Sequence, residues 1–145
     1  MRNGNLRDYI RINHAQLDDQ IKETWVQSAI RAVDFIHRFS VVYGDISARN
    51  FLVADDLSIK LCDFAGSGIG DAPAFISEGD RYRKALDEPR SVQTDLFALG
   101  CLIFEIVVGE RPYEEIGDED WEVVEGTTNV YIAAHEILLD IETAA

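Results

Sequence analysis

The chain has 145 residues, the length of about one domain, and 47% of them are hydrophobic and 28% charged. This composition supports a packed core and excludes a disordered, collagen-like or disulfide-scaffold chain. The net charge of −14 is uneven, because residues 112–145 hold 10 of the 27 acidic residues and none of the 13 Lys and Arg. Without clustered basic residues, we expect no binding to nucleic acid or to an anionic membrane surface.

The two cysteines and the apolar segments bear on the compartment. Cys62 and Cys101 lie in separate apolar runs, so we expect buried free thiols and no disulfide framework. The N-terminus lacks the pattern of a signal peptide, and the longest apolar stretch, residues 96–108, is too short to span a bilayer. These features predict a soluble, reduced, intracellular protein, and we assign it to the cytoplasm.

Two helices are predicted in the first 40 residues. A turn at residues 3–5 leads into a short helix that reaches Ile10. Asp18 and Asp19 are candidate N-caps for a second helix. The apolar stripe of that helix consists of Ile21, Trp25, Ala29, Val33 and Ile36. Their spacing of three and four residues predicts one buried face, so Trp25 is expected in the core.

The next segment changes to short strands. Residues 51–53 and 59–61 are apolar and are separated by a turn signal at Asp55-Asp56, which predicts a β-hairpin. Residues 63–90 contain several Gly and Pro and are expected to form a long functional or mobile loop. Residues 95–108 then predict a helix that is capped by Thr94 or Ser91, is followed by Gly109 and is buried on all sides. A weaker helical pattern covers residues 130–141.

Polar side chains gather at the open end of the predicted hairpin. Asp45 and Asn50 precede its first strand, and Asp63 follows its second strand, so the hairpin brings all three together. Carboxylate and amide oxygens suit Mg²⁺ beside phosphate groups, and a nearby carboxylate can accept a proton from an attacking hydroxyl. Taken alone, Asp45 and Asp63 are better explained as turn residues around a hairpin. Together they predict a site for phosphoryl transfer.

Five motifs in order resemble the C-terminal lobe of a eukaryotic-type protein kinase. Residues 45–50 (Asp-Ile-Ser-Ala-Arg-Asn) resemble the catalytic loop, and residues 63–65 (Asp-Phe-Ala) resemble the metal-binding Asp-Phe-Gly motif. Residues 94–100 resemble the start of the central buried helix, and residues 109–113 the segment after it. Residues 4–10 resemble the first helix below the hinge. The implied fold class is α+β, mainly α: a kinase C-terminal lobe with a small β-hairpin carrying the catalytic loop.

The resemblance implies roles for individual residues. Asp45 matches the catalytic base that accepts the proton of the substrate hydroxyl. Asn50 and Asp63 match the ligands of the Mg²⁺ ions bound to ATP, and Leu52 matches the apolar floor under the adenine. Asp95 matches a structural residue that anchors the backbone of the catalytic loop. The implied cofactors are ATP and Mg²⁺, and the implied partner is a protein substrate.

Other positions concern the branch of the family and its regulation. Arg49 falls where tyrosine kinases carry a catalytic-loop Arg, and Ser47 stands where serine/threonine kinases place a Lys, so the loop resembles the tyrosine-kinase branch. The usual His-Arg before the catalytic Asp is Tyr43-Gly44 here, and Gly44 cannot bind an activation-loop phosphate. Ala65 in the Gly position restricts the backbone at a switch point.

The extent of the resemblance sets three interpretations side by side. Nothing in this sequence resembles the preceding lobe, with its Gly-rich loop and Lys, that covers ATP in kinases. We therefore expect residues 1–113 to form a partial kinase domain and residues 114–145 a divergent acidic segment. The chain is then an enzyme with negligible activity in isolation, an inactive kinase-like binding module (a pseudokinase), or a truncated fragment of a longer kinase.

Two further expectations concern modification and association. Ser67, Ser77 and Tyr82 lie in the long loop and are candidates for phosphorylation, although a solvated loop is the simpler interpretation. Faces that would meet the missing parts of a kinase domain should expose apolar surface. We expect association through those exposed faces.

Overall fold

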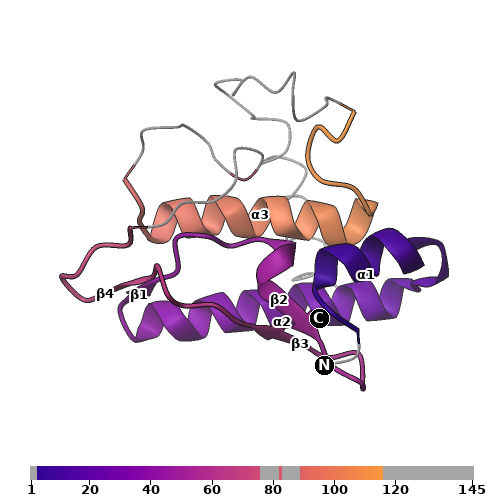
Figure 1. Ribbon diagram of the computed structural model, residues 1–145, viewed down its shortest axis with the longest axis horizontal. Helices are drawn as coiled ribbons and strands as arrows, with labels where there is room; N and C mark the ends of the chain where they lie inside the picture. Colours follow the sequence, from indigo (N-terminus) through magenta and orange to yellow (C-terminus); the bar gives the residue numbers. More distant parts are fainter. Residues whose placement is uncertain (1–2, 76–81, 83–88, 116–145) are drawn as a thin grey trace.

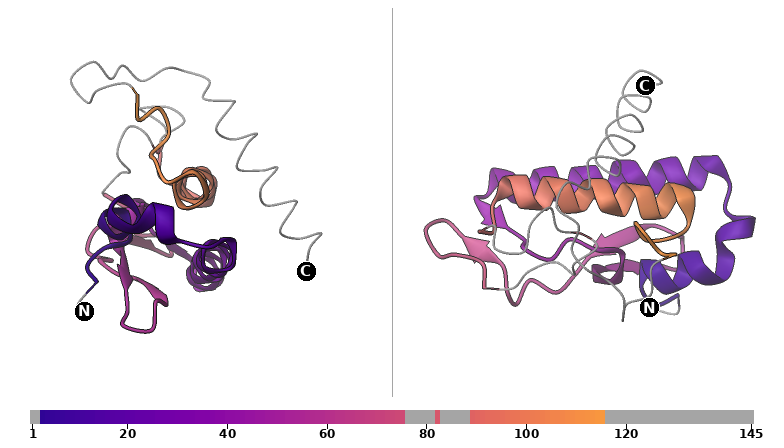
Figure 2. Two further views of the ribbon diagram at one scale, coloured as in Figure 1. Left: turned by 90° about the vertical axis from the view of Figure 1, so that its right-hand side faces the viewer. Right: turned by 90° about the horizontal axis from the view of Figure 1, so that it is seen from above.

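A computed structural model describes residues 3–75, 82 and 89–115 of the chain. The elements are α1 (Leu6–Asn13), η1 (His14–Gln16), α2 (Asp19–Arg38), β1 (Val41–Val42), η2 (Ala48–Asn50), β2 (Phe51–Val53), β3 (Ile59–Leu61), β4 (Gly68–Ile69) and α3 (Val92–Val108). Helices α2 and α3 lie side by side along the long axis, and the two small sheets lie toward opposite ends of it (Figures 1 and 2). This arrangement confirms the predicted α+β class.

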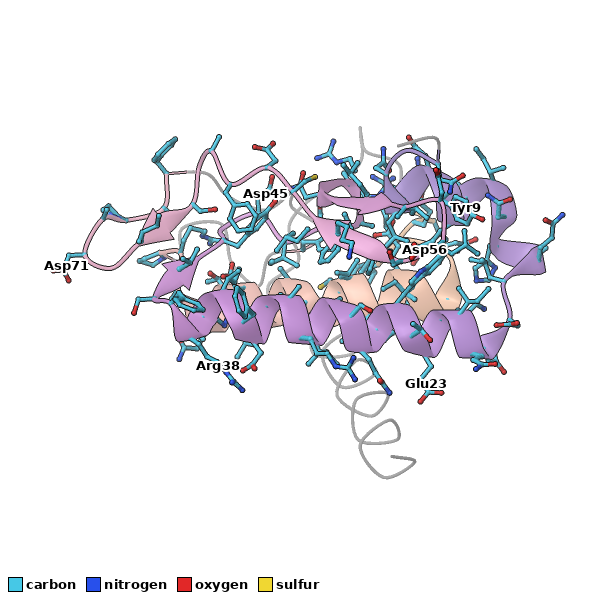
Figure 3. All side chains as sticks on the ribbon, turned by 90° about the horizontal axis from the view of Figure 1, so that it is seen from below. Tyr9, Glu23, Arg38, Asp45, Asp56 and Asp71 are labelled. Carbon is cyan, nitrogen blue, oxygen red and sulfur yellow. The ribbon has the colours of Figure 1, made fainter. Side chains whose placement is uncertain are left out.

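Helix α2 forms as its sequence pattern predicts. Asp18 is the N-cap, and its carboxylate accepts a hydrogen bond from the backbone N–H of Ile21 at 2.8 Å. The buried face consists of Trp25, Val26, Ala29, Val33 and Ile36. On the other side, Glu23 and Arg38 point away from the packed face (Figure 3). Trp25 is therefore a core residue, as expected.

Helix α3 is the central element, with its ends set by the predicted residues. Ser91 is the N-cap, and it forms a capping box with Thr94, which lies inside the first turn. The helix consequently begins at Val92, three residues earlier than the pattern of residues 95–108 predicts. Gly109 ends it in the left-handed conformation, with φ of 92°.

The predicted hairpin is present, with Phe51 opposite Leu61 and Val53 opposite Ile59. Its closed end rests on α2, because the indole N–H of Trp25 donates to the carbonyl of Leu57 at 2.6 Å. The strand order also leaves Asn50 opposite Cys62 at the open end, where the Cys62 N–H donates to the Asn50 carbonyl at 2.9 Å. The hairpin therefore has one fixed end on α2 and one end at the predicted site.

One structured part of residues 63–90 was not predicted. Strand β4 pairs antiparallel with β1, with Val41 opposite Ile69. The chain then reverses in a tight turn through Gly70 and Asp71, which lies at the tip of the molecule in Figure 3. A two-residue strand that contains a glycine has no alternating pattern, so the sequence could not reveal it. The expected long loop therefore contains a two-residue strand, Gly68–Ile69.

The remaining expectations have mixed outcomes. Cys101 is buried as expected, but Cys62 is partly exposed, because it lies where the hairpin opens. Within residues 3–75 and 89–115 no helix is both long and apolar enough to cross a membrane. Large apolar side chains are exposed on several elements, namely Ile12, Phe35, Phe39, Phe64, Ile69, Phe75, Val92, Leu96 and Val108. Association through such faces stays a prediction, and the predicted helix 130–141 lies outside the described residues.

Gly109 offers a first test of the packing between the helices. We expect Gly109→Ala to lower the free energy of unfolding by about 3 kcal/mol, because a Cβ there meets the ring of His14 and φ is left-handed. Gly70→Ala is the matched control, with φ of 58° and nothing within 4 Å of the added Cβ. It should cost about 1–2 kcal/mol. Equal losses in urea denaturation of the two variants would contradict a steric role for His14.

Candidate active site

The loop that carries the predicted catalytic residues is anchored from α3. Asp95 is completely buried, and its carboxylate accepts the backbone N–H groups of Tyr43 at 2.8 Å and Gly44 at 2.9 Å. Nε2 of His37, near the end of α2, lies 2.9 Å from the same carboxylate. Gly44 has φ of 86°, a conformation that glycine adopts without strain. Asp95 therefore joins α2, α3 and the loop immediately before Asp45.

Asp45 and Asn50 are in direct contact across this loop. The amide Nδ2 of Asn50 donates to Oδ2 of Asp45 at 3.1 Å and to the Asp45 backbone carbonyl at 2.9 Å. Ala48–Asn50 form η2, and the Asn50 N–H donates to the carbonyl of Ser47, the residue before η2, at 3.1 Å. Both hydrogen bonds to Asp45 use the amide nitrogen of Asn50. The amide oxygen of Asn50 accepts no hydrogen bond from any described residue and is available to a ligand.

Asp63 follows the other strand of the hairpin and is exposed. Its φ of 62° is left-handed, which Asp tolerates better than most residues. Tyr43 holds both of its neighbours, because the Tyr43 hydroxyl donates to the Cys62 carbonyl and its ring meets the Phe64 ring edge-on at 5.1 Å. The sequence did not predict this role for Tyr43, since a hydroxyl at the usual His position carries no pattern of its own.

Burial and the nearby charged groups both shift the pKa of the Asp45 carboxyl. Burial raises the pKa of its carboxyl above the ordinary value, and the negative charge of Asp63 also raises it. The Asn50 hydrogen bond and the charges of Arg49 and Arg7 act in the opposite direction. The pKa of the Tyr43 phenol is raised by burial and by the nearby Cys62, Asp45, Asp63 and Asp95. The Tyr43 hydroxyl therefore stays a hydrogen-bond donor at physiological pH.

The oxygen atoms at the hairpin end suit a magnesium ion bound together with phosphate. Mg²⁺ usually takes one or two carboxylates and completes its coordination with water and substrate phosphate. The Asn50 amide oxygen and the exposed Asp63 carboxylate provide such a partial set. Among the described residues there is no group of three or more His, Cys, Asp or Glu that could form a full protein cage. The residues present therefore fit Mg²⁺ held mainly by a nucleotide.

The other predicted site residues lie around this centre. Arg49 is exposed beside Asn50, and its charge reaches Asp45. Leu52 is half-buried in β2 opposite Lys60 and forms a bridge with Asn5 on its other side. Figure 3 shows Asp45 on the side of the ribbon opposite α2, between the tip at Asp71 and the hairpin turn at Asp56. Asp45 and Asn50 are thus in contact, and Asp63 acts on Asp45 through its charge.

A buried polar cluster that joins α1, α3 and Tyr82 was not predicted from the sequence. Glu105 of α3 accepts hydrogen bonds from Arg7 of α1 and from the hydroxyl of Tyr82. The one signal in the sequence was the single charge of Glu105 in the apolar stretch 96–108, because a buried charge needs a partner. Tyr82 is almost fully buried, so the solvated-loop interpretation is wrong for this residue. Ser77 lies outside the described residues.

Comparisons with known proteins agree with this geometry. The family model of the protein kinase domain matches residues 1–142, so it continues through most of the acidic segment. The chain belongs to the protein kinase family. It is 29% identical over 119 residues to a probable serine/threonine-protein kinase of Dictyostelium discoideum, covering 74% of this chain and 22% of that protein.

Two other relatives have similar coverage. Cyclin-dependent kinase-like 2 of Oryctolagus cuniculus is 30% identical over 112 residues, which are 72% of this chain and 19% of that protein. Serine/threonine-protein kinase PLK4 of Nematostella vectensis is 25% identical over 148 residues, which are 93% of this chain and 14% of that protein. The chain therefore spans at most about a fifth of the length of these curated relatives.

Proposed function

We propose that the site transfers the γ-phosphoryl group of ATP to a hydroxyl of a protein substrate. The observation that carries the proposal is the contact between Asp45 and Asn50 at the hairpin end that also holds Asp63. Family membership supports ATP and a divalent cation as cofactors and a protein as substrate. In this chain we assign Asp45 and Arg49 to the reacting groups. We assign Leu52 to the apolar floor under the adenine of ATP.

The residues of the site have different roles in the proposed reaction. Asp45 accepts the proton from the attacking hydroxyl, and the Asn50 amide keeps its carboxylate in a fixed orientation. Asn50 and Asp63 would hold Mg²⁺, which neutralises charge on the phosphates when it is bound. Arg49 is placed to pair with anionic groups of the nucleotide or substrate, because its guanidinium is exposed beside the loop.

The branch of the family is a separate question within this proposal. Arg49 and Ser47 led to the prediction of a tyrosine-kinase-like loop, whereas the Dictyostelium and Nematostella relatives are named serine/threonine kinases. We infer from the relatives that an aliphatic hydroxyl is the acceptor. Phosphoamino-acid analysis of a substrate that contains Ser, Thr and Tyr separates the two, since phosphotyrosine alone would support the prediction from Arg49.

Asp63→Asn tests the proposed reaction. In isolation the natural chain should transfer labelled phosphate from Mg·ATP to a generic protein substrate only slightly above background, and the variant should lose this residual transfer. Asp56→Asn, in the far turn of the hairpin, is the matched control and should retain the activity. Equal background transfer by the natural chain and Asp63→Asn would exclude the enzyme interpretation. A thermal shift with Mg·ATP in that case would identify a nucleotide-binding module.

A further inference from the structure

An asparagine followed by a glycine lies where the start of the chain meets the hairpin. The amide Nδ2 of Asn3 donates to the carbonyl of Ala54, just after β2, at 3.0 Å. The next residue, Gly4, accepts a hydrogen bond from the Val53 N–H at 2.9 Å through its carbonyl oxygen. Asn3 and Gly4 are therefore attached to the hairpin by one side-chain and one backbone hydrogen bond, and the proposed reaction uses neither.

The backbone N–H of Gly4 is unobstructed. Gly4 is exposed, its φ of 66° is left-handed, and a Cβ at this position would meet nothing within 4 Å. Among the described residues, none accepts a hydrogen bond from the Gly4 N–H. A main-chain amide attacks the side-chain amide of a preceding asparagine most readily when its own residue has no Cβ to hinder the approach. Asn3 and Gly4 thus supply the electrophile and the nucleophile of such a ring closure.

We propose that Asn3 is a modification site at which the side-chain amide is lost spontaneously and an isoaspartyl linkage to Gly4 forms. The Gly4 nitrogen bonds to Cγ of Asn3, the bond from Cγ to Nδ2 breaks, and ammonia leaves with the proton of the Gly4 amide. Water then opens the succinimide ring. Its oxygen bonds to one ring carbonyl carbon, the bond from that carbon to the Gly4 nitrogen breaks, and the nitrogen regains a proton.

The site of ring opening determines the product. Attack of water at the main-chain carbonyl carbon of residue 3 leaves isoaspartate, and attack at Cγ leaves ordinary aspartate. Water is the co-reactant in both cases, and neither product regains the lost ammonia. The modification is therefore irreversible and needs no enzyme.

The hairpin restrains this reaction while residue 3 is in place. The nitrogen that must leave as ammonia is the one that donates to the Ala54 carbonyl. Departure of ammonia requires that hydrogen bond to break, so the reaction proceeds from conformations in which residue 3 has opened away from the hairpin. The rate of conversion therefore depends on how often this attachment opens.

The products cannot restore the original contacts. Both carry a carboxylate at residue 3 at neutral pH, and a carboxylate only accepts hydrogen bonds, so it repels the Ala54 carbonyl instead of donating to it. Isoaspartate also inserts an extra carbon atom into the main chain before Gly4. That insertion displaces the Gly4 carbonyl from the Val53 N–H. Conversion of Asn3 therefore detaches the start of the chain from β2.

This attachment lies beside the candidate active site. Asn5 forms an antiparallel bridge with Leu52 and is the N-cap of α1, and α1 packs against η2. Detachment of residues 3–5 would thus loosen the strand that carries Leu52. The relevance of Leu52 to ATP rests on the proposed function, whereas the conversion of Asn3 and the detachment do not.

The test follows the full chain at pH 8 over time by peptide mapping and mass spectrometry. Conversion appears as the mass increase for replacement of an amide by a carboxyl group at residue 3, and labelling by a protein isoaspartyl methyltransferase identifies isoaspartate. A synthetic peptide of residues 1–10 gives the rate without the hairpin. The full chain should convert about threefold to tenfold more slowly than the peptide, which is the factor expected for one ordinary hydrogen bond.

Two controls locate the reaction. Asn5 should keep its amide in the same chain, because it precedes Leu6, which has a Cβ, and its own amide donates to Asp8 at 2.9 Å. The variant Asn3→Gln keeps the amide donor but needs a larger ring, so it should show no mass increase at residue 3. An equal mass increase at Asn5, or in Asn3→Gln, would contradict the assignment to the Asn3-Gly4 pair.

Hydrogen exchange of the converted chain, separated by its added charge, tests the detachment. The Val53 N–H should lose protection, whereas the Cys62 N–H, which donates to the Asn50 carbonyl in the same hairpin, should keep it. Unchanged protection of Val53 would show that the attachment survives conversion. Absence of converted Asn3 in the full chain when the peptide reaction is complete would overturn the modification site, and equal rates in chain and peptide would overturn the restraint by Ala54.

Discussion

Replacing Asp95 with alanine should lower the free energy of unfolding by about 3–5 kcal/mol, the largest loss we expect from any single substitution in the loop anchor. The carboxylate is completely buried and accepts the N–H groups of Tyr43 and Gly44, so its removal leaves two buried donors without an acceptor. It also removes the partner of His37. Urea denaturation monitored by circular dichroism measures the loss.

Two controls separate the anchor from ordinary helix effects. Asp95→Asn keeps one acceptor oxygen and should cost less than the alanine variant, and Leu96→Ala, at a half-exposed position of the same helix, should change stability little. Amide hydrogen exchange gives the local readout, since Tyr43 and Gly44 should lose protection in Asp95→Ala. Protection that is unchanged at both residues would contradict the anchoring role of Asp95.

Sequence reasoning succeeded where the determinants are local. The N-cap at Asp18, the stripe that contains Trp25, the hairpin across Asp55-Asp56 and the helix stop at Gly109 all depend on residues within a few positions of one another. The same holds for Asp45 and Asn50, whose contact spans five residues. Short-range spacing therefore predicted most of the elements and the core of the candidate site.

The missed features depend on contacts between distant residues. Glu105 is paired with Arg7, 98 positions away, and a single sequence contains nothing that selects Arg7 from the other basic residues. The β1–β4 pair likewise joins two-residue strands that are too short to show a period. The support that Tyr43 gives to both neighbours of Asp63 is visible only once the hairpin and the loop are placed together. Tertiary structure, and not local propensity, determines these features.

Asp45→Asn should abolish the proposed transfer and yet stabilise the fold at neutral pH. Loss of a general base typically costs about 10²- to 10⁴-fold in rate. Burial raises the pKa of the Asp45 carboxyl above its ordinary value of 3.8, so the native chain binds this proton more tightly than the unfolded chain does. This tighter proton binding stabilises the native chain relative to the unfolded chain. The stabilisation is complete below pH 3.8 and is lost as the pH rises through the raised native pKa of Asp45.

The pH dependence of the difference between the variant and the natural chain follows from that sign. Asparagine carries no charge, so the Asp45→Asn variant should have the higher unfolding midpoint at pH 7, and the difference between the two midpoints should close as the pH falls below about 4.

Asp56→Asn is the matched control, for which we expect a change in stability of the opposite sign. Hydrogen bonds from Ser58 lower the pKa of Asp56, so its carboxylate contributes stability that is present above pH 3.8 and lost as the pH falls through the lowered native value. Thermal scans from pH 3 to pH 8 should therefore show Asp45→Asn above the natural chain and Asp56→Asn below it at neutral pH. A neutral-pH midpoint of Asp45→Asn below that of the natural chain would mean that the ionised carboxylate stabilises the loop, contrary to the burial argument.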